Sequence, residues 1–333
     1  MATETAPTLE DWRDLYEHAR VFRANAPWEA FADDQLFAVV DPRTQETAYC
    51  CVLGAGGIEY GLAVYRGSAG VKAYLMAAVG ACDSEEMMLA QDCLSFLLGD
   101  REMLGPEERS LQKALGFKFR GKGAWPLFRS YRPGYLAATC RREEVWLLAT
   151  CLQQTWALIQ DVLAGVRVPK FTPGTRILAR QRDQRGVWEI TTVPFPIPPA
   201  GPRIEVPETR IKGLQQSLPR TPETWQVGVQ VIAPVEEGFD APYWAWMLMC
   251  VDAKMGTIHS FNIGGPQDTV QGQFLSAVEK AGFLPRELQM TSPLLHSQLE
   301  PIARPLGVKI RQVSRLRALD HASGSLKQAF LRR

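Results

Sequence analysis

The chain has 333 residues, of which 46% are hydrophobic, so it is long enough to form two globular domains that each bury a core. Its 37 Lys and Arg residues nearly balance its 36 Asp and Glu residues, which excludes a general electrostatic attraction to nucleic acid or to anionic membranes. Any affinity of that kind has to come from a local patch.

The first half of the chain is predicted to be an amphipathic helix followed by an α/β domain. Thr8 and Asp11 form a capping-box pattern, and apolar residues then recur at helical spacing until Pro27. Three strands are expected next, over residues 36–40, 47–53 and 59–65. After them we expect helices at 67–79, 84–91, 106–115 and 143–163, with a strand at 93–98 and extended chain at 117–128.

A boundary between domains is predicted near the middle of the chain. Residues 176–193 have the pattern of a hairpin, and residues 194–207 contain six prolines in 14 positions, which cannot pair as a central strand. We therefore expect an N-terminal domain over 1–168, a hairpin and proline-rich linker over 169–207, and a C-terminal domain over 208–333.

The second half is predicted to have the element order βββαβαβα. Strands are expected at 225–232, 244–251, 257–263, 288–290 and 308–313, and helices at 267–281, 293–306 and the C-terminus. The meander gives antiparallel strands and the alternating part requires parallel ones, so we expect a mixed five-stranded sheet covered by helices. Read the same way, the first domain also has the order βββαβαβα. The fold class is thus α/β with mixed sheets in two domains.

Two resemblances follow from these segments. The element order of residues 222–325, with Asp252 closing a strand before a turn, resembles a degenerate member of the RNase H-like fold of integrases and transposases. The segments DLYEHARVFRANAPWEAF, LFAVVDPRTQETAYCCVLG and LGFKFRGKGAWPLFRSYRPGY resemble the first domain of a bacterial family of unknown function, and PYWAWMLMCVDAKMGTIHSFNI resembles the domain that often follows it. The resemblance to these two domains of unknown function implies no activity for this chain.

Metal-dependent nucleases of the RNase H-like fold need carboxylates on the first strand and after the fourth, close enough to hold two metal ions. In the second domain the first strand, WQVGVQVIAP, has no acid, and Thr291 and Ser292 follow the fourth. Asp252 also suits a plain Gly-closed turn. In the first domain the corresponding places hold Asp41, Asp100, Glu143 and Glu144. These four acids are candidate catalytic residues, with Mg²⁺ or Mn²⁺ as the cofactor that this alternative requires.

A basic and aromatic segment, residues 117–132, is the strongest local signal. Cations and aromatic rings alternate there without an intervening acid, as at Lys118, Arg120, Lys122, Trp125, Arg129, Tyr131 and Arg132. Such a strip can place cations along phosphates and stack rings on bases, so a nucleic acid or a protein is its candidate partner. The competing interpretation is that Phe117 and Phe119 simply face a core while the cations face water.

Cysteine and histidine spacing argues against a metal site. The seven cysteines form no C-x-x-C pair and lie near no histidine at ligand spacing, and no two histidines have ligand spacing, so no zinc site is predicted and no metal ligand is assigned. The first residues lack a signal peptide, and no apolar run is long enough for a membrane span, so we expect a cytoplasmic protein with no membrane contact. We interpret the chain as a non-catalytic binding or scaffold protein without a cofactor; the alternative is a metal-dependent nuclease or phosphoryl-transfer enzyme.

Overall fold

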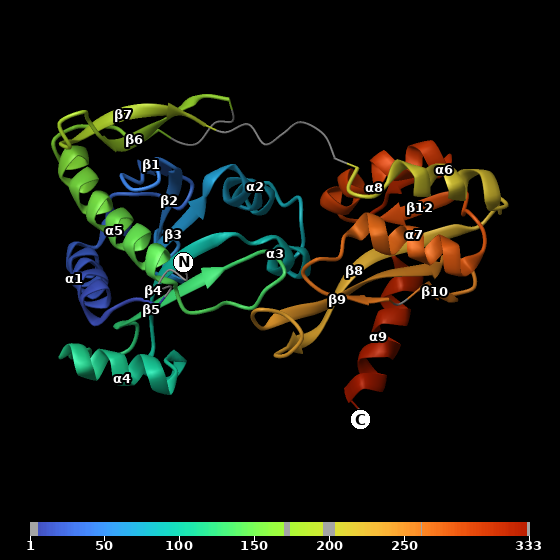
Figure 1. Ribbon diagram of the computed structural model, residues 1–333, viewed down its shortest axis with the longest axis horizontal. Coiled ribbons are helices and arrows are strands. Elements are labelled where there is room, and N and C mark those ends of the chain that lie inside the picture. The colour runs from blue at the N-terminus through green and yellow to red at the C-terminus, as the bar shows by residue number, and fades with distance from the viewer. Residues whose placement is uncertain (1–5, 170–173, 196–203, 261, 332–333) are drawn as a thin grey trace, which may run out of the picture. The chain divides into compact units, whose positions relative to one another are not determined.

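The protein has two compact units, described here from a computed structural model (Figure 1). The structure describes residues 6–169, 174–195, 204–260 and 262–331. The first unit contains the described residues up to 74 together with 92–132 and 137–195. The second contains 75–91, 133–136 and the described residues from 204 onward. Within the described part of the chain, no helix combines the length and the apolar composition needed to cross a bilayer.

The first unit is built on a mixed sheet of seven strands in the order β5-β4-β3-β2-β1-β6-β7. All neighbouring strands are antiparallel except β1 and β6, which are parallel. The strands are β1 (Leu36–Val40), β2 (Thr47–Leu53), β3 (Gly61–Arg66), β4 (Cys93–Gly99), β5 (Trp125–Tyr131), β6 (Arg176–Arg182) and β7 (Trp188–Pro194). The hairpin β6–β7, which we expected to form part of the linker, therefore extends this sheet.

Helices α1 (Leu9–Asn25) and α5 (Arg142–Leu163) pack side by side over one face of this sheet (Figure 1). The predicted capping box is present: the Thr8 hydroxyl accepts from the Asp11 amide, and the Asp11 carboxylate accepts from the Thr8 amide. The predicted apolar face of α1 is buried, at Trp12, Leu15, Tyr16, Ala19 and Phe22. The other helices of the first half are α2 (Gly67–Ala78), α3 (Ser84–Ala90), α4 (Pro106–Leu115) and the 3-10 turns Pro27–Glu29 and Arg101–Met103.

The second unit holds a mixed sheet in the order β10-β9-β8-β12-β13, and the two-residue strand β11 also pairs with β9. β12 runs parallel to both β8 and β13, whereas the pairs around β9 are antiparallel. The strands are β8 (Thr224–Val235), β9 (Tyr243–Asp252), β10 (Ile258–Ser260), β11 (Ile263–Gly264), β12 (Glu287–Met290) and β13 (Lys309–Gln312). The mixed α/β class predicted for both domains is confirmed. The single strand expected over 257–263 is replaced by the two short strands β10 and β11, so this sheet has six strands instead of five.

Both faces of the second sheet are covered. Helices α6 (Glu208–Ser217), α7 (Val270–Ala281) and α8 (Pro293–Leu306) pack on one face, and α9 (Arg317–Leu331) packs on the other (Figure 1). Side chains along β9 alternate between these layers, so Trp246 and Leu248 join the first core while Met247 and Met249 join the second. Burial on both faces explains why β9 has a nearly continuous apolar sequence.

Two short segments from the first half of the chain are built into the second unit. The Gly134 amide donates to the Leu89 carbonyl, and the Trp244 amide donates to the Gly134 carbonyl, both at 2.9 Å. The Val231 amide of β8 donates to the Glu85 carboxylate of α3 at 2.8 Å. These hydrogen bonds complete the backbone pairing around β8 and β9, and they place α3 in the wall of a cavity of the second unit.

Candidate functional site

The acids predicted for a nuclease centre in the first unit do not converge. Asp41 follows β1 and Asp100 follows β4, and the four strands β1 to β4 run antiparallel one after another. β1 and β4 therefore run in opposite directions, and their C-terminal ends lie on opposite sides of the sheet along the strand direction. Three steps between strands of about 4.8 Å each also separate the two positions sideways by roughly 14 Å. This arrangement does not favour a two-metal site, whose ions are about 4 Å apart.

Each of the four acids has a different place in the first unit. The Asp41 carboxylate accepts from the Arg43 amide at 3.0 Å within its own turn, and Asp100 accepts from the Gly123 amide at 2.7 Å. Glu144 accepts from the Arg66 guanidinium at 2.5 Å and from the Ser130 hydroxyl at 2.7 Å. Glu143 is exposed in the first turn of α5. For Asp41, Asp100 and Glu144 these hydrogen bonds explain the carboxylates without any reaction chemistry.

The basic and aromatic segment divides into an inner and an outer part. Phe117 stacks on Tyr16 with ring centroids 5.3 Å apart, and Phe119 lies beside both rings. Three more residues belong to the inner part. Arg129 forms an ion pair with Glu108, and Trp125 donates from Nε1 to the Gly121 carbonyl. Tyr131 is partly buried, and this burial raises its pKa. Arg132 is half-buried, and Lys118, Arg120 and Lys122 are exposed. Only the outer part is thus available to a partner.

A groove of the first unit adjoins this outer part. It has a volume of about 400 Å³ and runs between α1 and residues 115–119. Its charged lining residues are Arg13, Glu17, Arg20, Arg23 and Lys118. Glu17 pairs with Arg20 at 2.8 Å, so the lining keeps an excess of positive charge. The groove and the exposed cations next to it form one basic surface.

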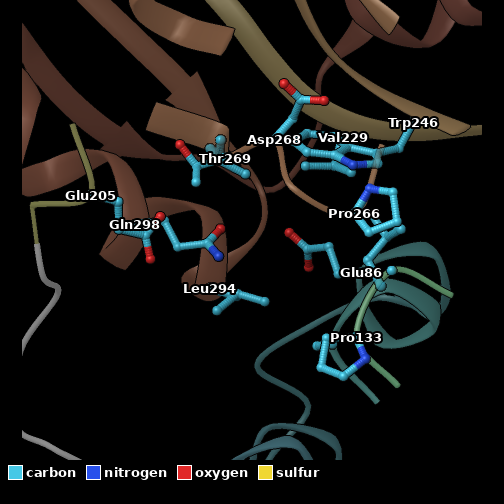
Figure 2. Close-up of a pocket in the computed structure, with 14 residues that line it drawn as sticks. Glu86, Pro133, Glu205, Val229, Trp246, Pro266, Asp268, Thr269, Leu294 and Gln298 are labelled. Carbon is cyan, nitrogen blue, oxygen red and sulfur yellow. The ribbon is translucent and has the colours of Figure 1, made fainter. Parts of the chain in front are cut away.

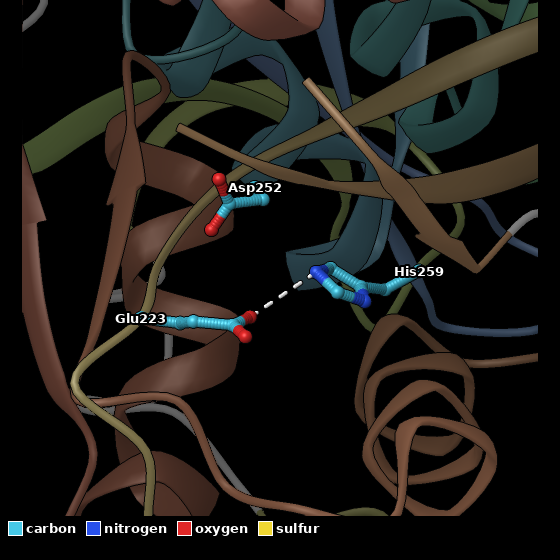
Figure 3. A group of neighbouring side chains, drawn as sticks. All are labelled: Glu223, Asp252 and His259. Atoms are coloured by element: carbon cyan, nitrogen blue, oxygen red, sulfur yellow. Dashed lines mark ion pairs between the residues drawn. The ribbon is translucent and has the colours of Figure 1, made fainter. Parts of the chain in front are cut away.

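The second unit holds a cluster of three side chains that can bind a metal ion, Glu223, Asp252 and His259 (Figure 3). Glu223 immediately precedes β8, Asp252 ends β9 and His259 lies on β10. Because these three strands are neighbours and β9 is antiparallel to both others, their ends meet at the same edge of the sheet. One potential ligand atom from each residue lies within 4.8 Å of the others.

Asp252 is held in place by the turn that follows it. One carboxylate oxygen accepts from the Lys254 amide at 2.9 Å and from the Met255 amide at 2.5 Å. Gly256 closes the turn with a φ of +71°, a left-handed conformation that favours glycine. The predicted turn role of Asp252 is therefore confirmed. It uses one oxygen, Oδ1, which leaves Oδ2 to serve as a ligand.

The orientation of His259 is fixed by two aromatic rings. Its imidazole stacks on Trp225 at 4.6 Å, and the ring of Phe283 meets it edge-on at 5.6 Å. The imidazole Nε2 lies 3.3 Å from the Glu223 carboxylate but forms no hydrogen bond with it. Trp225 also donates from Nε1 to the same carboxylate at 3.1 Å. One tryptophan thus positions two of the three potential ligands.

One nitrogen and two carboxylate oxygens are ligands for Zn²⁺ or Mn²⁺. Ligand atoms on one such ion, bound at about 2.0 to 2.2 Å, lie roughly 3.0 to 3.6 Å from one another. Binding an ion would therefore bring the most widely separated ligand atoms of the cluster closer together, while Glu223 and His259 already lie 3.3 Å apart. A pocket of about 490 Å³ opens beside the cluster, so further coordination positions can be reached from solvent.

In the sequence of the second domain Asp252 alone stands out among these three residues, and no metal ligand is predicted there. Glu223 and His259 lie 29 and 7 residues from Asp252 along the chain, which matches no compact ligand motif. Their proximity follows from the strand register, which places Trp225, two residues after Glu223, opposite Asp252. No local sequence signal gives this register.

Two families of known domains match this chain. Residues 12–180 match the domain of unknown function DUF7309, and residues 210–327 match the domain of unknown function DUF6930. No curated protein matches the chain.

Proposed function

We propose that this chain, which belongs to the family of the domain of unknown function DUF7309 and continues with a DUF6930 domain, is a non-catalytic binding protein. We further propose that its second domain holds one divalent metal ion. Glu223, Asp252 and His259 are the proposed ligands. The observation that carries this proposal is the convergence of one histidine and two carboxylates, from three neighbouring strands, to within 4.8 Å.

The sheet supports a degenerate RNase H-like fold for the second domain. In chain order its five main strands are arranged 3-2-1-4-5, with the second strand antiparallel to its neighbours. This strand order is consistent with the RNase H-like fold that the element order resembles. The acids of a two-metal nuclease are missing from β8 and from the residues after β12, Thr291 and Ser292. A single-metal site that binds a ligand agrees better with this set of side chains.

The pocket beside the cluster favours an anionic ligand. Lys254 and Arg286 both line it, together with the three proposed metal ligands. A metal ion held by two carboxylates and a neutral imidazole carries no net charge, so these two cations and the open metal positions would attract a phosphate or carboxylate group. We infer that the metal ion and the two cations bind such a group jointly.

Calorimetric titration of the full chain with ZnCl₂ and with MnCl₂, after treatment with a chelator, tests the metal site. We expect one ion per chain, and we expect His259→Gln and Glu223→Gln each to weaken binding at least tenfold. His296→Gln, a histidine substitution on α8 of the same unit, is the matched control and should bind like wild type. Equal affinity in all three variants, or no binding by wild type, would overturn the proposal.

The anionic ligand is tested separately with methylphosphonate. We expect it to bind to the metal-loaded chain and not to the metal-free chain, and we expect Lys254→Ala to weaken this binding without changing metal affinity. Binding that is the same with and without the metal ion would contradict a joint site.

The basic surface of the first unit supports a second binding function, directed at nucleic acid. Lys118, Arg120 and Lys122 are exposed next to a groove lined by further arginines. Clustered cations bind phosphates by releasing counterions, so affinity should fall steeply with salt. A competing protein partner with an acidic surface would show salt dependence too, and a titration with single-stranded DNA and RNA decides between them.

A further inference from the structure

A second cavity of the second unit differs in chemistry from the metal centre. Its volume is about 260 Å³, and it has no lining residue in common with the pocket beside the metal centre. Its apolar walls include Leu89, Val229, Trp246, Pro266 and Leu294, and its acidic residues are Glu86, Glu205 and Asp268. Among the described residues, none that lines this cavity is a lysine, arginine or histidine.

Glu86 is the most informative residue of this cavity. It is only 4% exposed, and burial raises the pKa of its carboxyl group. One of its oxygens accepts from the Ser292 hydroxyl at 2.8 Å and from the Asp83 amide at 3.1 Å. Within the part of the chain that the structure describes, no cation lies within ion-pair distance of it. Figure 2 shows its carboxylate turned into the cavity, toward the side chain of Gln298.

A buried carboxylate without a cationic partner is uncommon in proteins, because burial costs free energy that an opposite charge or hydrogen bonds must offset. The hydrogen bonds from Ser292 and Asp83 fix one oxygen, Oε2. The other oxygen lies at a cavity wall where a bound cation would complete its interactions. Leu89, Val229, Trp246, Pro266 and Leu294 give the cavity apolar walls, which suit a ligand that joins a cationic head to a short hydrocarbon stem.

We propose that this cavity binds an alkylammonium group, with the ammonium head against Glu86 and Gln298 and the methylene stem against Trp246 and Leu294. The volume is below the roughly 300 to 1,000 Å³ of cavities for drug-sized ligands, so a small amine fits better than a nucleotide. A free aliphatic amine and the lysine side chain of a peptide present the same group.

The test is calorimetry on the full chain at pH 8, a pH that favours the ionised form of a carboxyl group. The probes are 1,4-diaminobutane for a free amine and N-acetyl-lysine methylamide for a peptide lysine, with 1,4-butanediol as the neutral counterpart. We expect at least one amine to bind and the diol not to bind. The amine that binds more tightly identifies the source of the group. Failure of both amines to bind at millimolar concentration would overturn the proposal.

Glu86→Gln should weaken amine binding at least tenfold, because it removes the charge and keeps an oxygen that can accept from Ser292. Glu300→Gln, an exposed position on α8, is the matched control and should leave binding unchanged. If Glu86→Gln does not fold, Gln298→Leu takes its place and should weaken binding severalfold. Wild-type affinity in the folded variant would contradict the assignment. His259→Gln should bind amines normally, which separates this site from the metal centre.

Discussion

The Nε2 atom of His259 lies 3.3 Å from the carboxylate of Glu223, although 36 residues separate them along the chain. Asp252, the last residue of β9, lies next to this pair and completes the cluster (Figure 3). A histidine on one strand and a carboxylate before another can meet in this way only if the three strands are neighbours with the correct register. The candidate metal centre is therefore a property of the assembled sheet.

Substitutions at Asp252 should separate its role in the turn from its proposed role as a ligand. In Asp252→Asn the side-chain oxygen can still accept from the Lys254 and Met255 amides, so the melting temperature should stay close to that of wild type while metal affinity falls at least tenfold. Asp252→Ala should lose both metal affinity and stability, by about 1 to 2 kcal/mol. Thermal denaturation and calorimetry check the pair. Wild-type metal affinity in Asp252→Asn would leave only the turn role.

Asp11 should stabilise the first unit in a way that depends on pH. Burial alone would raise its pKa, but hydrogen bonds from Trp146 and Thr8, together with the charge of Arg142, lower the pKa from 3.8 to about 2. A lowered pKa in the folded state gives stability that is complete above about pH 4 and is lost as pH falls toward 2. Asp11→Asn should cost about 2 kcal/mol at pH 7 and almost nothing at pH 2.

Urea denaturation followed by circular dichroism at several pH values measures this difference. The control is Asp14→Asn on the exposed side of α1, which should change stability little at any pH. A cost of Asp11→Asn that stayed constant between pH 7 and pH 2 would contradict the ionic origin of the effect.

Arg66 should be among the most sensitive charged positions of the first unit. Its guanidinium contacts the carboxylates of Asp92 and Glu144 and also donates to the Tyr131 carbonyl, so it ties β3 to β4, β5 and α5. Arg66→Ala leaves two mostly buried carboxylates without their cation, which should cost about 3 to 5 kcal/mol. Arg20→Ala, which breaks an exposed pair with Glu17, should cost less than about 1 kcal/mol in the same denaturation experiment.

Alanine substitutions of the cations in the basic segment should have different effects on stability and on nucleic acid binding. Arg120→Ala and Lys122→Ala, at exposed positions, should leave the melting temperature unchanged and each reduce the salt dependence of nucleic acid binding by about one phosphate contact. Arg129→Ala should instead lower stability, because Glu108 would lose its partner. Fluorescence anisotropy with DNA and RNA at several salt concentrations tests this. An unchanged salt slope in both surface variants would refute phosphate contacts at these residues.

Local sequence determined the elements and the fold class of this protein. The capping box of Thr8 and Asp11, the apolar face of α1 and the turn at Asp252 each depend on residues only a few positions apart, whose hydrogen bonds and spacing can be read directly. The apolar run of β9 likewise indicated a strand. Mixed sheets in two domains followed from the order of these elements.

Only the tertiary structure decided which strands became neighbours. Element order in the first domain allowed β4 to lie beside β1, but β4 pairs with β3, so Asp41 and Asp100 stay apart. In the second unit the pairing of β8, β9 and β10 brought Glu223 to His259, and α3 supplied Glu86 to the wall of a cavity. Pairing between distant segments depends on the packing of whole layers, which local propensity and spacing do not encode.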